Sequence, residues 1–321
     1  MRPYTSKVKT KVNKKTVKTV KTVTNMKIMK NKLTAGAPLI EYVRNNMTES
    51  LHSGHLLILN KTGNIELSLG KHNFLIYPRS AIKAIQTSAM VRNGLNLPAE
   101  LIALVCSSHI GTPMHQTKVK EILATVGLNE SFLQNTPLPT SLASPCSGKH
   151  AGMLVTSEIN GWSLENYKNP RHPVQKAIKK ELELLSEERI TKIAVDGCGA
   201  PLFALTLRGL ARTIHNLMVS PDPVHQQVVN ACRDYPVMVS GEGTLPTVAM
   251  QTVKGLFVKT GAESVLVAGL SNGYTIAWKI SDGSERGEKE LLTASLKKIG
   301  ITANFSSSKK SEPQVLIRAV L

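Results

Sequence analysis

Long hydrophobic runs are absent from this sequence of 321 residues. A membrane-spanning helix needs roughly 18 or more consecutive apolar residues, and no stretch approaches that length. The N-terminal region also lacks the apolar centre of a secretory signal peptide. Since hydrophobic side chains still make up 41% of the chain, we expect a soluble, cytoplasmic protein with a sizeable folded core.

Cysteine is scarce, and the cysteines stand far apart in a long chain, which does not resemble a small disulfide framework. Reduced thiols or a metal site are the remaining interpretations. Two of the cysteines have no unusual neighbours and are expected in the core. The four residues are Cys106, Cys146, Cys198 and Cys232, of which the first and last are the expected core residues.

Acidic residues are missing from the N-terminal segment. Residues 1–33 carry eleven Lys or Arg and no Asp or Glu, so most of the net charge of +18 lies there. The Lys-Thr-Val repetition at 14–24 matches neither a helical nor a strand period. We therefore predict a basic, disordered tail at 1–34 and a folded domain at 35–321. An electrostatic arm for nucleic acid or anionic lipid and an organelle-targeting peptide are the functional alternatives for the tail.

The folded part mixes predicted helices and strands without strict alternation, which favours an α+β fold with an antiparallel sheet. A turn-rich tetrapeptide, KTGN, predicts a hairpin between 55–60 and 65–70. The segment 191–207 is interpreted as a buried strand, a Gly-rich corner and another helix. Helices are predicted over 78–90, 98–108, 114–127 and 174–188, and paired strands over 254–270 and 272–283.

The stretch YPRSAIKAIQ, residues 77–86, places Ser80 one helical turn before Lys83. Residues i and i+3 share a helix face, so a neutral lysine could accept the serine proton. Such a lysine needs a pKa well below its usual value of about 10.4. The spacing alone does not decide, because surface helices contain many such pairs. The later stretch SSHIGTPMH is either a polar turn after a helix or the source of a second relay hydroxyl, Ser108.

Two further motifs, SPCSGKHAGML and DGCGAPLFALTL, each place a cysteine beside glycines that permit close approach of the backbone. A Cys-x-x-Lys spacing is not a usual zinc signature, which would have Cys or His partners. From the spacing alone, a buried free cysteine in each motif therefore remains open.

Together with VKTGAESV and AWKISDG, these motifs resemble the bacterial L-asparaginase II family, the serine-dependent type with a zinc site. The resemblance covers roughly residues 38–285. It implies an amidohydrolase that converts L-asparagine to aspartate and ammonia, and so an asparaginase-like catalytic domain at 35–321. It also implies a serine β-lactamase/glutaminase-like fold, in which helices flank an antiparallel sheet beside a helical subregion. A symmetric homodimer is the default expectation for a soluble oligomer.

The resemblance also implies roles for individual residues. Ser80 would be the nucleophile and Lys83 its base, while Lys279 would work with Ser108. One zinc ion would be bound by two thiolates, an amine and a water molecule. The implied substrate-binding residues are Arg79, Asp196 and His109, and the implied zinc ligands are Cys146, Lys149 and Cys198.

The chain departs from the family pattern at Thr112, where a glutamate is favoured, and in a shorter connection from His115 to Cys146. The alternatives to an asparaginase are an amidohydrolase of glutamine or another amide, and a β-lactam-type acyl-serine enzyme. The Lys-Thr-Gly stretch at Lys259 is assigned to the asparaginase resemblance rather than to β-lactam chemistry. A non-catalytic zinc protein that binds nucleic acid through its tail is the alternative from another class.

Overall fold

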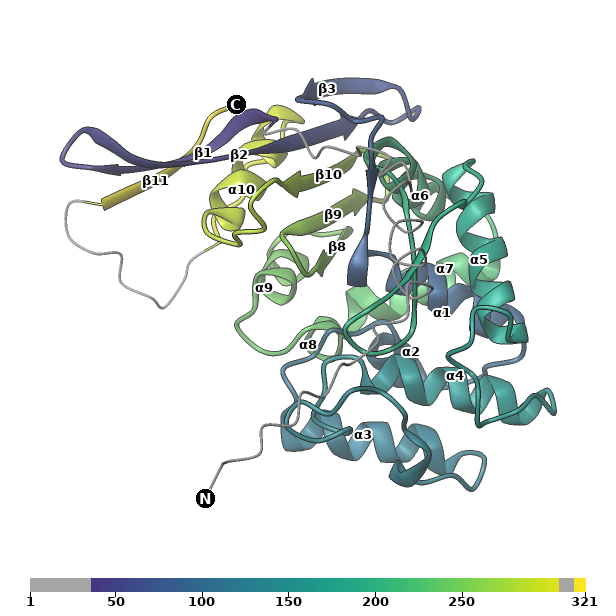
Figure 1. The fold of residues 1–321 in the computed structure, drawn as a ribbon. Coiled ribbons are helices and arrows are strands. Elements are labelled where there is room, and N and C mark those ends of the chain that lie inside the picture. The colour runs from purple at the N-terminus through teal and green to yellow at the C-terminus, as the bar shows by residue number, and fades with distance from the viewer. Residues whose placement is uncertain (1–35, 306–314) are drawn as a thin grey trace, which may run out of the picture. The chain divides into compact units, whose positions relative to one another are not determined.

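The computed structural model describes residues 36–305 and 315–321. The tail predicted at 1–34 lies outside the described residues. Helices surround one principal antiparallel sheet (Figure 1), which confirms the predicted α+β class with an antiparallel sheet. The strands of this sheet are β1 (Ala37–Arg44), β2 (Met47–Leu59), β3 (Ile65–Leu69), β8 (Leu256–Gly261), β9 (Val265–Leu270), β10 (Thr275–Ile280) and β11 (Val315–Ala319).

The strands run in the order β11-β1-β2-β10-β9-β8, and β3 pairs with β2 in addition. The hairpin expected across KTGN is confirmed as β2 and β3. Its turn forms because the side chain of Asn60 accepts hydrogen bonds from the backbone N–H groups of Thr62 and Asn64. The late strands are confirmed as β8, β9 and β10, which pair in succession.

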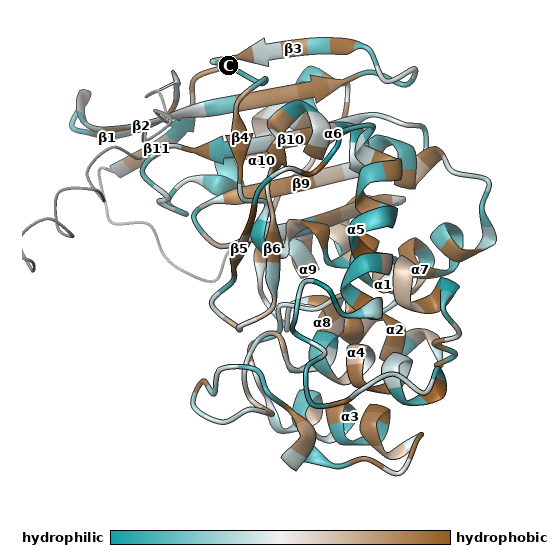
Figure 2. Cartoon of the chain, turned by 45° about the vertical axis from the view of Figure 1, so that its right-hand side comes forward, coloured by the Kyte–Doolittle hydropathy of each residue, from teal (hydrophilic) through white to brown (hydrophobic). Residues whose placement is uncertain are grey.

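The centre of the sheet is covered on both faces, because every residue of β9 and β10 is buried. Helix α6 (Leu207–Val219) packs on β2, β9 and β10, while α10 (Glu288–Lys298) contacts β1 and β11. Gly269 lets α6 approach closely, since a Cβ there would lie 2.6 Å from Met218 Cγ. The central strands are correspondingly hydrophobic in Figure 2, whereas helix α5 (Pro173–Ser186) shows both hydrophilic and hydrophobic segments.

A subregion of helices that pack on one another lies beside the sheet. Its central helix is α1, which is buried from Lys83 to Met90. The helices of the subregion are α1 (Lys83–Arg92), α2 (Ala99–Val105), α3 (Pro113–Ala124), α4 (Ser147–Ile159), α5 (Pro173–Ser186) and α7 (Pro223–Asp234). Shorter elements are η2 (Glu130–Phe132), α8 (Pro236–Val239) and α9 (Leu245–Thr252).

Two predicted elements differ from the structure. The helix expected over 78–90 begins with a 3-10 turn, η1 (Arg79–Ile82), before α1. The prediction of a buried strand followed by a helix at 191–207 is wrong in both parts. Instead, β5 (Ile193–Val195) pairs with β6 (Pro201–Phe203) apart from the main sheet, and Val195 is 73% exposed.

The chain turns back at this point because the N–H of Asp196 donates to the carbonyl of Ala200. The helix is delayed to α6, since β7 (Leu205–Thr206) first pairs with β4 (Leu75–Ile76). Within residues 36–305 and 315–321, no helix combines the length and the apolar character needed to cross a membrane.

Candidate active site

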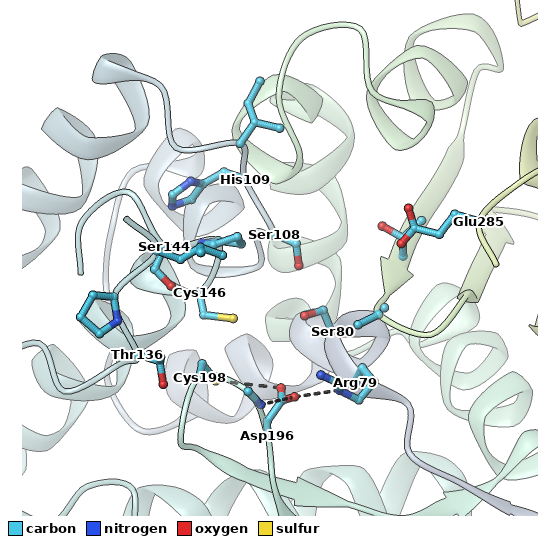
Figure 3. A pocket seen from close by; sticks show the side chains of 18 residues that line it. Arg79, Ser80, Ser108, His109, Thr136, Ser144, Cys146, Asp196, Cys198 and Glu285 are labelled. Carbon is cyan, nitrogen blue, oxygen red and sulfur yellow. Dashed lines mark hydrogen bonds and ion pairs between the residues drawn. The ribbon is translucent and has the colours of Figure 1, made fainter. Parts of the chain in front are cut away.

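A cavity of about 550 Å³ opens where six segments of the chain meet. These segments are the turn before α1, the loop after α2, the connection into α4, the turn between β5 and β6, the end of β8, and the loop between β10 and α10. The cavity brings together most of the side chains that the sequence singled out (Figure 3). The predicted residues that line it are Arg79, Ser80, Ser108, His109, Cys146, Asp196 and Cys198.

Ser80 lies on a strained turn at the edge of this cavity. The preceding residue, Arg79, has φ +52°, which non-glycine residues rarely adopt and which is commonest at functional sites. The end of β8 packs directly against the turn, and a Cβ at Gly261 would lie 2.5 Å from the Pro78 carbonyl oxygen. The turn directs the hydroxyl of Ser80 into the cavity, where it and the hydroxyl of Ser108 point toward one another (Figure 3).

Lys83 lies beneath these hydroxyls and is 1% exposed. Its Nζ donates to the carbonyls of Ser107 and Pro145, and it lies 3.1 Å from Ser108 Oγ and 3.3 Å from Cys146 Sγ. Among the described residues no hydrogen bond joins Lys83 Nζ to Ser80 Oγ, although the two share a helix face. The lysine of the Ser-x-x-Lys pair therefore connects the second serine to the thiol of Cys146.

A second buried lysine, Lys259 on β8, lies on the other side of Ser108. Its Nζ is 2.9 Å from Ser108 Oγ and donates to the carbonyl of Thr260 at 2.9 Å. Burial, together with the nearby charge of Lys83, lowers the pKa of Lys259 to about 7. Near neutral pH this amine is therefore populated in its neutral form, in which it can accept a proton.

Lys259 is the functional candidate that the sequence interpretation did not select. The structure pairs Ser108 with Lys259, whereas the expected partner, Lys279, directs its Nζ to the backbone carbonyls of Glu263 and Ile280. The sequence signal that could have identified Lys259 is the Lys-Thr-Gly stretch. It places a lysine in an otherwise apolar strand, two residues before the glycine that packs on the Ser80 turn. Burial also lowers the pKa of Lys279, while the charges of Glu263 and Asp282 oppose that shift.

Arg79 and Asp196 form the polar wall of the cavity opposite Ser108. Arg79 Nε donates to Asp196 Oδ1 at 2.8 Å, and the backbone N–H of Gly197 donates to the same oxygen at 2.8 Å. Burial alone would raise the pKa of Asp196, but the charge of Lys149 and the hydrogen bond from Arg79 lower it overall. Asp196 is thus held as a carboxylate, and it fixes the guanidinium beside Ser80.

The two motif cysteines meet beside Lys149, whose Nζ lies 3.2 Å from Cys198 Sγ. The hydrogen bond from Cys198 and the charges of Lys83 and Lys149 lower the pKa of Cys146 well below its usual value, although burial opposes this. Cys146 also occupies the N-cap of α4, where the helix dipole favours a thiolate. Burial alone would lower the pKa of Lys149, but the nearby charges of Cys198, Cys146 and Asp196 raise it overall.

Gly148, which lies between Cys146 and Lys149, lets helix α4 pack closely against the end of α2. A Cβ at Gly148 would lie 2.2 Å from the carbonyl oxygen of Leu104, so only glycine lets α4 approach the end of α2 this closely. That contact places the first turn of α4, with Lys149, directly below the loop that carries Ser108.

A sequence model described as L-asparaginase II matches residues 40–317. The chain belongs to the L-asparaginase II family. The match spans the sheet, the helical subregion and every residue that the resemblance implied for the site. A search of curated proteins returns no match.

Some solved structures show a distant likeness to this L-asparaginase II family member. One is the crystal structure of Mglu in its native form in the presence of 4.3M NaCl, with 12% identity, a TM-score of 0.47 and coverage of 78% of this chain. The chain spans 61% of that Mglu chain. Another is EstCE1, a hydrolase with promiscuous acyltransferase activity, with 8% identity, a TM-score of 0.44 and coverage of 77% of this chain and 93% of that one.

The donors around Cys146 suit a zinc ion, which prefers sulfur and nitrogen ligands. In the part of the chain that the structure describes, no group of three or more His, Cys, Asp or Glu side chains is arranged to hold a metal ion. The third donor of this family member would instead be the amine of Lys149, next to the two sulfurs. The three predicted ligands, Cys146, Lys149 and Cys198, therefore lie close together, and zinc binding would require the amine of Lys149 to lose its proton.

His109 holds the loop after α2 rather than presenting a free imidazole to the cavity. The N–H of Gly111 donates to His109 Nδ1 at 3.0 Å, so Nδ1 is unprotonated and Nε2–H donates to Ser147 Oγ at 2.8 Å. The ring stacks on His115 with 4.8 Å between centroids. Burial, followed by the charges of His115 and Lys83, lowers the pKa of His109 to about 3. The neutral ring thereby ties the Ser108 loop to the start of α4.

Thr112, where the resemblance led us to expect a glutamate, stabilises the local structure. It is the N-cap of α3, and its Oγ1 lies 2.6 Å from His115 Nδ1. His115 in turn lies 3.1 Å from the carbonyl oxygen of Val237. Thr112 thus anchors the loop, through His115, to helix α8.

Proposed function

We propose that this protein is an L-asparagine amidohydrolase, which releases aspartate and ammonia through an acyl-enzyme on Ser80. The observation that carries the proposal is the convergence of two serines and two buried lysines on one cavity. Ser80 and Ser108 face one another there, and Lys83 and Lys259 both lie within hydrogen-bonding distance of Ser108 Oγ. Membership of the L-asparaginase II family supports the choice of the amide substrate.

In the first step, Ser80 Oγ attacks the side-chain amide carbon of asparagine and forms a C–O bond. The hydroxyl proton passes through Ser108 to the neutral amine of Lys259, whose pKa of about 7 suits a base near neutral pH. Lys83, whose Nζ lies 3.1 Å from Ser108 Oγ, helps to orient the Ser108 hydroxyl in this relay. When the C–N bond breaks, the same relay returns the proton to the departing nitrogen, and ammonia leaves.

In the second step, water attacks the acyl-enzyme and gives its proton to the relay. The ester bond to Ser80 breaks, the serine regains its proton, and aspartate is released. The Ser80 backbone N–H, at the start of η1 and beside Gly261, is the candidate donor to the oxyanion. Arg79, held by Asp196, is the candidate partner of a substrate carboxylate.

The arrangement also supports a fold of the serine β-lactamase/glutaminase type. In class A β-lactamases a Ser-x-x-Lys, a second serine motif and a Lys-Thr-Gly strand act together. The corresponding residues here are Ser80 with Lys83, Ser108, and Lys259 at the head of the Lys-Thr-Gly stretch that ends β8.

A substrate panel tests the proposal directly. The purified protein is expected to release ammonia from L-asparagine with a kcat/KM at least about tenfold above that for L-glutamine, since an extra methylene changes transition-state binding by this order. A chromogenic β-lactam is expected to remain intact. An enzyme-coupled ammonia assay measures the two amides, and absorbance measures the β-lactam. Faster turnover of glutamine would move the assignment to the alternative amidohydrolase, and turnover of no amide would favour the non-catalytic zinc protein.

We further infer that Cys146, Lys149 and Cys198 hold one zinc ion, which would add positive charge to the cavity wall. Metal analysis of the purified protein is expected to give about one zinc per chain. The Cys198→Ser variant is expected to retain less than about a tenth of that zinc, because a thiolate ligand is lost. Cys232→Ala removes a thiol from the core instead and is expected to keep the zinc. Equal zinc in both variants would place the metal elsewhere.

A further inference from the structure

The two carboxylates that line the cavity differ in whether they interact with other side chains. Asp196 is committed to Arg79 and the backbone of Gly197, whereas Glu285 enters no ion pair or side-chain hydrogen bond with the described residues. The other charged groups near the cavity include cations, since Arg79 lines it and Lys83 and Lys149 lie buried behind its walls. Glu285 is therefore the lining carboxylate that is free to receive a cation from a ligand.

The direction of Glu285 suits that purpose. Figure 3 shows its carboxylate turned toward the cavity, on the side of Ser80 opposite Arg79. Thr260 and Gly261 at the end of β8, and Ala262 directly after it, also line the cavity. A small ligand that presents its amide to Ser80 would thus have an acidic group on one side and a guanidinium on the other.

The loop that carries Glu285 is fixed on both sides of it. Before Glu285, the carboxylate of Asp282 lies 2.7 Å from His52 Nδ1 on β2. After it, the guanidinium of Arg286 stacks 3.2 Å from the centre of the Tyr42 ring and donates to Ser50 Oγ. These contacts attach the loop to the hairpin of β1 and β2, so Glu285 faces the cavity because its neighbours are turned away from it.

We propose that Glu285 binds the α-ammonium group of the substrate and makes the cavity selective for an α-amino acid amide. This inference rests on the proposed amidohydrolase function and names a specificity residue for it. The α-carbon of asparagine carries both an ammonium and a carboxylate, which match the charges of Glu285 and Arg79. A charge-assisted hydrogen bond of this kind orients the substrate so that its side-chain amide meets Ser80.

The test compares L-asparagine with succinamate, which is the same amide without the α-amino group. In Glu285→Gln, the kcat/KM for L-asparagine is expected to fall about 10- to 100-fold, mainly through KM, because one charged hydrogen bond is lost. The kcat/KM for succinamate is expected to stay within about twofold, since that amide has no ammonium to bind. Glu285→Asp should recover part of the loss.

The matched control is Glu242→Gln, which removes an exposed acid that does not line the cavity. It is expected to leave both substrates unchanged. An equal loss for asparagine and succinamate in Glu285→Gln, or no loss for either, would overturn the inference.

A second measurement separates this inference from the proposed function. If the wild-type protein released no ammonia from any amide, the proposed function would fail, and thermal denaturation with L-aspartate or succinate would still test Glu285. Stabilisation by L-aspartate that exceeds stabilisation by succinate, and that disappears in Glu285→Gln but not in Glu242→Gln, supports the role. Equal stabilisation by the two ligands, or by neither, contradicts it.

Discussion

Ser80→Ala is expected to reduce ammonia release from L-asparagine by about 10³-fold or more, because no acyl-enzyme can form without the nucleophilic oxygen. Ser80 lies on the strained turn after Arg79, and its hydroxyl faces the cavity. Removal of this oxygen leaves the contact between Gly261 and the turn intact, so the fold is expected to persist. Turnover is measured by coupled ammonia detection, and folding by circular dichroism and the melting temperature.

The control for this prediction is Ser144→Ala, which removes another hydroxyl from the cavity lining and is expected to change kcat less than about threefold. Mass spectrometry of acid-quenched enzyme is expected to find the substrate acyl group on the peptide that contains Ser80 in wild type. An acyl group on the Ser108 peptide, or full activity in Ser80→Ala, would show that the roles of the two serines are exchanged.

Lys259→Met is expected to lower kcat by about 10²- to 10³-fold, which is the usual contribution of a general base. The side chain lies 2.9 Å from Ser108 Oγ, and methionine keeps its approximate length in the buried strand without the amine. The wild-type kcat should rise with pH through about 7, because the amine acts as a base only after it loses its proton. Below that pH it should fall about tenfold per unit, and Lys259→Met should lose this dependence.

Lys279→Met is the matched control, since it replaces the lysine that the sequence resemblance paired with Ser108. The amine of Lys279 donates hydrogen bonds to the backbone carbonyls of Glu263 and Ile280. The variant is therefore expected to have a lower melting temperature, and its kcat is expected to keep the rise with pH through about 7. The two variants are compared at about equal protein concentration by steady-state kinetics over about pH 5.5 to 9 and by thermal denaturation. If Lys279→Met abolished the pH dependence of kcat and Lys259→Met kept it, the assignment of Lys259 as the base would be wrong.

Local sequence signals were sufficient for several of the elements. The turn residues of KTGN predicted the hairpin of β2 and β3, and Asn60 closes that turn through short-range hydrogen bonds. The apolar runs near the C-terminal end predicted β8, β9 and β10, which pair in succession. These predictions succeeded because each depends on residues close to one another in the chain.

The segment at 191–207 shows where such signals fail. The Ile-Ala-Val run has the composition of a buried strand, but Ile193 and Val195 are exposed in a hairpin apart from the main sheet. The reversal depends on the backbone around Asp196, and the helix starts only where β7 has paired with β4. Whether a strand is buried depends on which other elements pack against it, and the composition of the strand alone does not indicate this.

The sequence by itself indicated the family, the Ser80 and Lys83 pair at helical spacing, and the expected zinc ligands Cys146, Lys149 and Cys198. These depend on residue identity at short spacing, which motifs such as CSGKHAGM carry directly. Only the tertiary structure decided which lysine lies beside Ser108, because Lys259 on β8 has its amine 2.9 Å from Ser108 Oγ, whereas Lys279 on β10 directs its amine to backbone carbonyls. The low pKa of Lys259 follows from burial beside Lys83, and that proximity exists only after the chain has folded.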